Sequence, residues 1–314
     1  MESSRIALGT FKTASPEAVV HAVKAGYRII DCAAAYFNQE EVVGAALSKL
    51  FEEGVVTRSE LFIVSKLPNT HHQWNATDSE RIVRSIRKTL DELKIEQLDL
   101  FLMHWPVAFA DEYQDYSKVR LPDGRPDPSV QKRMEYKATW KAMEGLVSAG
   151  LTKQIGVSNF TVEQLEDLKV VATIQPCVNQ IEVHPYHTND ELRAYCSSNK
   201  IRVMAYSPLG SCKQKFPSSS GCTLLENNVV KEVASALGKS PAQVLLKWSY
   251  ENDPNVTPVA KSSNAARISE NFAAARDDWE LGEANVEKLR KLNADYRYFD
   301  SYVGGQWHDG IIEG

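Results

Sequence analysis

The stretch Arg28-Ile29-Ile30-Asp31-Cys32-Ala33-Ala34-Ala35-Tyr36 carries the pattern around which the rest of the chain is organised. Its first half is an apolar run that predicts a short buried strand over Arg28–Cys32. Its second half is a loop of small residues that ends at Tyr36. Because a carboxylate at the end of a buried strand loses its hydration, Asp31 requires a charged or hydrogen-bonding partner.

Two later apolar runs supply candidate partners at the same ends of their predicted strands. Leu61–Ser65 leads into Lys66, and Leu98–Met103 leads into His104. In a closed parallel barrel, the carboxyl ends of the strands form the face on which catalytic residues occur. We therefore expect one face to bring together four polar side chains: Asp31, Tyr36, Lys66 and His104.

Short apolar runs alternate with helix-like stretches along the whole chain. The predicted strands are Ile6–Thr10, Arg28–Cys32, Leu61–Lys66, Leu98–His104, Gln154–Ser158, Cys177–Glu182, Arg202–Ser207 and Val256–Ala260. The predicted helices are Pro16–Ala25, Glu40–Phe51, one from Asp78 or Ser79, Met134–Ala149, Val162–Val170, Asn189–Ser198, Asn228–Leu237, Pro241–Glu251, Ala265–Ala274 and Glu283–Leu292. Eight βα units favour an α/β fold with a closed (β/α)8 TIM barrel over an open sheet, and we expect a single domain over residues 1–314.

Three stretches interrupt this alternation, at Val107–Gln131, Leu209–Thr223 and the tail Tyr296–Gly314. A connection of about 25 residues without regular structure is uncommon unless it covers a functional site. We therefore interpret the first stretch as a loop inserted over the active site. The chain contains no G-x-G, so neither a Rossmann fingerprint nor a P-loop is present to hold phosphate.

The composition is ordinary for a globular protein, and we expect a small molecule as the partner. A net charge of -5 disfavours nucleic acid and acidic membranes as partners. The five cysteines are scattered and odd in number, and reduced thiols are the simplest interpretation. No stretch approaches the roughly 18 apolar residues of a membrane span, and we expect a cytoplasmic protein. No histidine cluster has metal-ligand spacing, so no metal is expected.

The four polar residues suit the chemistry of a tuned proton donor. A tyrosine has a pKa of about 10, which makes it a poor acid at neutral pH. An ammonium about 4 Å away, at an effective dielectric of about 20, interacts by roughly 4 kcal/mol and can lower that pKa by up to about three units. Lys66 can act in this way on Tyr36, with Asp31 keeping the lysine charged. His104 can then orient a carbonyl substrate.

Other interpretations of the same residues remain open at this point. Asp31 and Lys66 alone are typical of a structural ion pair, and His104 alone of a core histidine. A Schiff-base aldolase at Lys66 would need a neutral amine, which a neighbouring Asp31 disfavours. The presence of all four on one barrel face favours catalysis by proton transfer.

With these residues in view, the chain resembles the aldo-keto reductase family, and within it the aldose and xylose reductase branch. The resemblance covers nearly the whole chain. It rests on these motifs: Leu8–Lys12, Gly26–Ala33, Tyr36–Asn38, Phe62–Leu67, Leu102–Pro106, Gly156–Phe160, Asn179–Pro185, Ala205–Gly210, and Lys261–Ser262 with Arg267, Glu270 and Asn271.

The resemblance implies a barrel that binds extended NADPH and reduces aldehydes, including aldoses, and some ketones to alcohols. On the family pattern, Tyr36 protonates the carbonyl oxygen, Lys66 and Asp31 tune it, and His104 orients the substrate. Phe11, Trp105 and Trp307 would line the substrate pocket. Phe11 and Pro68 stand where the aldose reductase branch has tryptophans, so the size of the preferred substrate is left open.

The resemblance also implies where the cofactor lies. Tyr206 would stack on the nicotinamide, and the carboxamide would contact Ser158, Asn159 and Gln180. At the adenosine end lie Lys261, Ser262, Ser263, Asn264 and Arg267, whose cations and hydroxyls suit the 2′-phosphate of NADPH, with NADH as a secondary cofactor. The remaining residues expected at the cofactor are Thr10, Phe11, Asp31, Ser207, Leu209, Ser211, Glu270 and Asn271.

Two further expectations concern function and assembly. The alternative to a reductase is a barrel that binds NADPH without turnover and serves as a regulatory subunit. The family tendency implies a monomer, with a dimer as the alternative.

Overall fold

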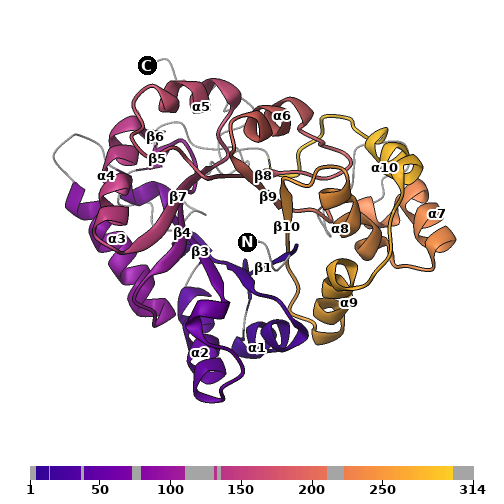
Figure 1. The fold of residues 1–314 in the computed structure, drawn as a ribbon, viewed down its shortest axis with the longest axis horizontal. Coiled ribbons are helices and arrows are strands. Elements are labelled where there is room, and N and C mark those ends of the chain that lie inside the picture. Colours follow the sequence, from indigo (N-terminus) through magenta and orange to yellow (C-terminus); the bar gives the residue numbers. More distant parts are fainter. Residues whose placement is uncertain are drawn as a thin grey trace, which may run out of the picture.

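The computed structural model describes residues 5–13, 15–36, 39–72, 79–109, 131–132, 136–210 and 223–299. Within these ranges, eight parallel strands close into a barrel in the order β1-β10-β9-β8-β7-β4-β3-β2. Figure 1 shows the strands at the centre of the molecule and the helices around them. This arrangement confirms the predicted (β/α)8 barrel.

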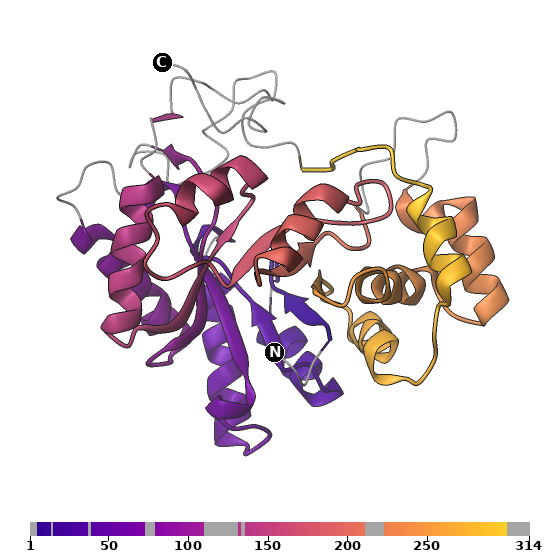
Figure 2. The ribbon, with the colours of Figure 1, turned by 45° about the horizontal axis from the view of Figure 1, so that its top comes forward.

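The bounds of the elements agree with the predicted ones to within two residues at each end. The barrel strands are β1 (Ala7–Gly9), β2 (Ile29–Asp31), β3 (Phe62–Leu67), β4 (Leu98–Met103), β7 (Thr152–Ser158), β8 (Val178–Glu182), β9 (Arg202–Tyr206) and β10 (Val256–Ala260). The helices are α1 (Pro16–Ala25), α2 (Gln39–Glu52), α3 (Ser79–Leu93), α4 (Tyr136–Ser148), α5 (Val162–Lys169), α6 (Asp190–Ser198), α7 (Asn228–Leu237), α8 (Pro241–Glu251), α9 (Ala265–Arg276) and α10 (Glu283–Arg290). In a view tilted from the first, the last helices gather on one side of the barrel (Figure 2).

The prediction for the stretch after β4 was wrong at the two ends of that stretch. The long stretch after β4 was expected to lack regular structure, but β5 (Ala108–Phe109) and β6 (Gln131–Lys132) pair as antiparallel strands. Ala108 lies opposite Lys132 in this ladder. The two strands pair the beginning of this stretch with its end. Each strand is too short to leave a periodic signal in the sequence.

The apolar pattern explains both layers of the core. Inside the barrel, strand residues such as Leu100, Leu102 and Met204 pack together. Between the barrel and its helices lies a larger core, into which α3 turns Ile82 and Ile86. Because all eight strands are parallel, their carboxyl ends meet at one face, and the loops that follow them share that face.

Candidate active site

Asp31 and Lys66 form a buried ion pair at the ends of β2 and β3. The Nζ of Lys66 donates to both carboxylate oxygens of Asp31, at 2.8 and 2.9 Å, and to the backbone oxygen of Cys32 at 2.7 Å. Lys66 is 0% exposed and Asp31 is 2% exposed. Since an isolated charge is costly to bury, the pairing compensates the burial of both groups and fixes their positions.

Two other strands contribute contacts to Asp31. Gln180 of β8 donates its Nε2 to the Asp31 Oδ1 at 2.8 Å. Thr10, directly after β1, donates its hydroxyl to the Asp31 backbone oxygen at 2.9 Å. Because β8 and β2 are not neighbours in the barrel, the Gln180 contact spans the barrel interior. The amide expected at a cofactor thus donates to the ion pair in this structure.

His104 lies directly after β4 and is 7% exposed. Its backbone oxygen accepts from Asn159 Nδ2 at 3.0 Å, which fixes the residue between β4 and β7. Burial, followed by the nearby Lys66 ammonium and His72, holds the pKa of His104 well below its usual value of 6.5. The ring is therefore neutral at physiological pH and is suited to orienting a polar group rather than carrying charge.

Tyr36 ends a short 3-10 helix, Ala34–Tyr36, that follows β2. The backbone of Tyr36 therefore lies in the loop that leads from Asp31 to α2. Its side chain lies outside the described part of the structure. The expected meeting of Asp31 and Lys66 is observed, while the role of Tyr36 stays a prediction.

A second group of polar side chains lies at the ends of β7 and β9. The Ser158 hydroxyl donates to the Gln180 backbone oxygen at 2.8 Å, and Asn159 Nδ2 donates to the Ser158 Oγ at 3.0 Å. The Tyr206 hydroxyl donates to Asn159 Oδ1 at 2.9 Å. Phe299 packs edge-on against the Tyr206 ring, with centroids 6.0 Å apart. The half-buried Tyr206 ring is thus fixed both at its hydroxyl and by a neighbouring aromatic.

The loop after β9 begins with a tight turn. Ser207 has a positive φ of 53°, and the Gly210 N–H donates to the Ser207 backbone oxygen at 2.8 Å. Leu209 lies half-buried in this turn. Ser211, the next predicted contact, lies outside the described residues.

The residues expected at the adenosine end follow β10 and surround the start of α9. Asn264 caps the helix by accepting from the Arg267 N–H at 3.0 Å, and its own N–H donates to the Ser262 Oγ at 3.1 Å. Lys261, Ser263 and Arg267 are exposed. Glu270 is half-buried and Asn271 is buried. An exposed helix N-terminus flanked by two cations is a general anion-binding arrangement.

The expected substrate residues have different surroundings. Phe11 is 40% exposed beside the barrel end. Trp105 is 8% exposed and, with Asn159, lines a cavity of about 600 Å³. Asn293, Asp295, Tyr296 and Arg297 also line this cavity. Trp307 lies outside the described residues.

A buried carboxylate holds the segment that leads into the C-terminal tail. Glu182 ends β8, is 0% exposed and accepts from His184 Nε2 at 2.8 Å. It also accepts from the backbone N–H groups of Tyr298 at 2.7 Å and Phe299 at 3.1 Å. Burial acts to raise the pKa of Glu182, but the hydrogen bonds from His184 and these two N–H groups outweigh it, so the pKa is lowered. The carboxylate therefore fixes Phe299 beside Tyr206.

The same segment makes further contacts with the loop between β8 and α6. The Tyr186 backbone oxygen accepts from the N–H groups of Ala294 and Tyr296, at 3.2 and 2.9 Å. Asn293 Oδ1 accepts from the Thr188 N–H at 3.2 Å. Hydrogen bonds to the loop between β8 and α6 thus hold residues 293–299 in place.

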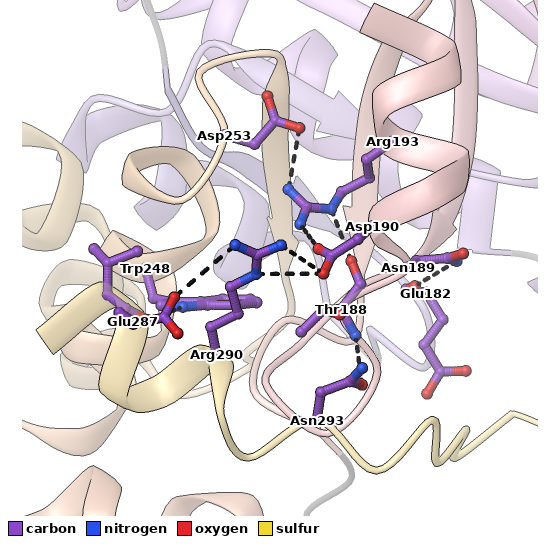
Figure 3. Close-up of polar contacts among 11 residues, drawn as sticks. Glu182, Thr188, Asn189, Asp190, Arg193, Trp248, Asp253, Glu287, Arg290 and Asn293 are labelled. Atoms are coloured by element: carbon purple, nitrogen blue, oxygen red, sulfur yellow. Dashed lines mark hydrogen bonds and ion pairs between the residues drawn. The ribbon is translucent and has the colours of Figure 1, made fainter. Parts of the chain in front are cut away.

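An ion-pair network fixes the loop between β8 and α6 and also α10, the helix that precedes residues 293–299 (Figure 3). Arg193 of α6 is 5% exposed and donates to the Thr188 backbone oxygen at 2.7 Å and to Asp253 at 3.1 Å. Its guanidinium also pairs with Asp190, which in turn pairs with Arg290 of α10 at 2.9 Å. Figure 3 shows Asp190 between the two guanidinium groups. The network joins α6, α10 and the loop before β10.

Replacing Glu182 by glutamine is expected to destabilise the protein by about 2–3 kcal/mol, because the charge-assisted hydrogen bonds are lost and an amide N–H faces a backbone N–H. A carboxylate with a lowered pKa stabilises the fold above its unfolded pKa, and this stability is lost as the pH falls through the folded value. Urea unfolding at pH 7 and below pH 4.5 measures both effects. The exposed Glu280→Gln is the matched control. Equal stability of the two variants at pH 7 would contradict the anchoring role.

Sequence reasoning missed Glu182 and its partner His184 as functional residues. The available signal was the one used for Asp31, an acidic residue at the end of an apolar strand. The partners of Glu182 lie 116 and 117 residues away along the chain, at Tyr298 and Phe299. No local pattern connects these positions, so the contact emerges only with the fold.

Comparisons with known proteins agree with this geometry. The model of the aldo/keto reductase family matches residues 6–294. The chain is 42% identical over 296 residues to aldo-keto reductase family 1 member A1 of Gallus gallus, covering 93% of this chain and 86% of that protein. It is 38% identical to aldose reductase C of Dictyostelium discoideum, covering 93% and 87%.

Solved structures give the same result. The aldose reductase of Giardia lamblia matches with a TM-score of 0.80 and 35% identity, over 95% of this chain and 94% of that one. An aldo-keto reductase of Bombyx mori in complex with NADP matches with a TM-score of 0.78 and 32% identity, over 97% and 92%. A family match across nearly the whole chain and relatives at about 40% identity confirm the resemblance read from the motifs, and the chain belongs to the aldo/keto reductase family of oxidoreductases.

Proposed function

We propose that this oxidoreductase uses NADPH to reduce aldehydes, including aldoses, and some ketones to alcohols, with Tyr36 as the general acid. The observation that carries the proposal is the buried Asp31–Lys66 pair at the carboxyl face of the barrel, next to a neutral His104. The loop that holds Tyr36 begins at Asp31. Relatives named aldose reductase support aldehydes as the substrate class.

The residues around the barrel mouth fit a dinucleotide. The half-buried ring of Tyr206 provides a flat face held by Asn159 and Phe299. Ser158 and Asn159 supply the hydrogen-bonding groups that an amide requires. Lys261 and Arg267 flank the α9 N-terminus, which suits the 2′-phosphate of NADPH. The NADP complex of the Bombyx mori relative supports this choice.

When bound, NADPH supplies the hydride. The chain's own residues supply the proton and the orientation. Lys66 places a fixed positive charge near the Tyr36 loop, and this charge favours release of the tyrosine proton to the carbonyl oxygen as that oxygen gains negative charge. Asp31 keeps the ammonium charged and aimed. His104, being neutral, orients the carbonyl group without competing as a cation.

The substrate side of the proposed site includes Trp105 and the segment that leads into the C-terminal tail. We assign Trp105 to the wall of the substrate space, since it directly follows His104 after β4. Trp105 and Asn159 also line a cavity of about 600 Å³. Four residues of the segment 293–297 line the same cavity, and we expect the tail that follows this segment to contribute to substrate selection. None of the helices in the described residues qualifies as a membrane span.

The purified protein is expected to oxidise NADPH in the presence of glyceraldehyde, with a smaller kcat/KM for NADH because NADH lacks the 2′-phosphate. Loss of cofactor absorbance measures both rates, and a reaction without aldehyde is the control. Binding of NADPH without turnover over a panel of aldehydes would favour the regulatory barrel instead.

A further inference from the structure

A second buried carboxylate lies close to the ion pair but takes no part in the proposed proton transfer. Glu40, in the first turn of α2, is 1% exposed. Its Oε1 accepts from the Ser65 hydroxyl of β3, and its Oε2 accepts from the Thr89 hydroxyl of α3 at 2.9 Å. Glu40 therefore links α2 to both a barrel strand and the next helix.

The position of Ser65 connects Glu40 to the active site. Ser65 directly precedes Lys66, and side chains alternate between the two faces of a strand. Lys66 points to the inner face and pairs with Asp31, while Ser65 points outward to the helices. Glu40 thus holds the outer face of the same strand, four residues after Tyr36 in the chain.

The charge of Glu40 is coupled to groups on several elements. Burial raises the pKa of Glu40 to about 7, against the hydrogen bonds from Ser65 and Thr89; Glu92 of α3 raises it further, and Lys66 lowers it. Cys32, after β2, is affected in turn: burial raises the pKa of its thiol, followed by the charges of Glu40 and Asp31. The charge on Glu40 therefore interacts both with Lys66 of β3 and with Cys32 after β2.

We propose that Glu40 is a positioning residue for the reductase reaction: it ties the loop bearing Tyr36 to the strand bearing Lys66, and its ionisation sets the charge balance around the lysine. This inference rests on the proposed function of Tyr36 and Lys66. Ionised Glu40 adds negative charge near Lys66, and this charge opposes formation of a tyrosinate at Tyr36. Protonated Glu40 keeps the hydroxyl contacts but removes this opposition.

The test is the pH dependence of kcat/KM for NADPH-dependent aldehyde reduction in the wild type, Glu40→Gln and Ser65→Ala. The wild type is expected to show an inflection near pH 7. Glu40→Gln should lack this inflection, and its alkaline limb should move to lower pH by roughly half a unit, because a nearby negative charge is gone. Ser65→Ala should keep the inflection but move it above pH 7, because the carboxylate loses one hydrogen-bond donor.

A second readout does not depend on turnover. A carboxyl whose folded pKa is raised takes up protons on folding, so the contribution of Glu40 to wild-type stability falls as the pH rises from about 5 through 7. Glutamine does not titrate. The melting temperature of Glu40→Gln relative to the wild type should therefore increase between pH 5 and pH 8, whether or not the variant is active.

The outcomes separate this inference from the proposed function. An inactive wild type, or an active Tyr36→Phe, overturns the proposed function itself. If those two behave as expected but Glu40→Gln gives the wild-type pH profile, or a loss of kcat that is the same at every pH, Glu40 has only a packing role. A relative melting temperature that does not change with pH would also overturn the inference.

Discussion

Lys66→Met is expected to lower reductase kcat by at least about 10²-fold and to cost about 3–5 kcal/mol of folding free energy. The activity falls because the positive charge near Tyr36 is removed. Stability falls because the buried Asp31 carboxylate loses its positively charged partner. Among the described side chains, the Gln180 amide is then the remaining hydrogen-bond donor to that carboxylate. Urea unfolding and NADPH oxidation measure the two effects on one preparation.

The double variant Lys66→Met with Asp31→Asn separates these effects. Removing both charges leaves no uncompensated ion, so the double variant should recover most of the lost stability. It should not recover activity, since the tyrosine still lacks the ammonium. If the single and double variants unfold at the same urea concentration, the ion pair does not carry the energetic role assigned to it.

Tyr36→Phe is expected to lower kcat by about 10²- to 10⁴-fold, the range for loss of a positioned general acid. The change removes one hydroxyl and keeps the ring, so NADPH binding should stay within a factor of about two of the wild type. Steady-state turnover and cofactor binding by quenching of protein fluorescence give the two numbers. The pattern expected is a fall in kcat with binding retained.

The control for this change is Tyr195→Phe, which removes a hydroxyl that donates to Glu166 on the helix surface at 2.6 Å. That variant should keep full activity. If Tyr36→Phe were as active as Tyr195→Phe, another group would have to supply the proton, and the proposed role of Tyr36 would be wrong.

The strand ends were readable from the sequence because a polar residue after an apolar run is a local signal. It placed Asp31, Lys66 and His104 correctly at one barrel face. The two-residue strands β5 and β6 gave no such signal, since a ladder this short has no period. The neutral state of His104 depends on burial beside Lys66, which only the folded chain reveals.

Contacts between distant parts of the chain were the hardest to foresee. Gln180 was expected at the cofactor carboxamide, and this role stays a prediction; its hydrogen bond to Asp31 was not foreseen. Glu40 and Glu182 lie in stretches that the sequence marks only as a helix start and a strand end. The roles of Tyr36, Ser211 and Trp307, the single-domain organisation, the cytoplasmic location and the oligomeric state stay predictions.

The Gln180 contact also bears on when the site comes into being during folding. Asp31 and Gln180 are 149 residues apart in the chain, and Thr10 reaches Asp31 from the strand that closes the barrel against β10. A chain that has formed only β1 to β4 can pair Asp31 with Lys66 but lacks the amide from β8. Contacts so distant in sequence form late, because the loop-closure entropy must be overcome first. Recovery of turnover after dilution from denaturant should therefore report closure of the whole barrel. It should not report the earlier formation of β1 to β4.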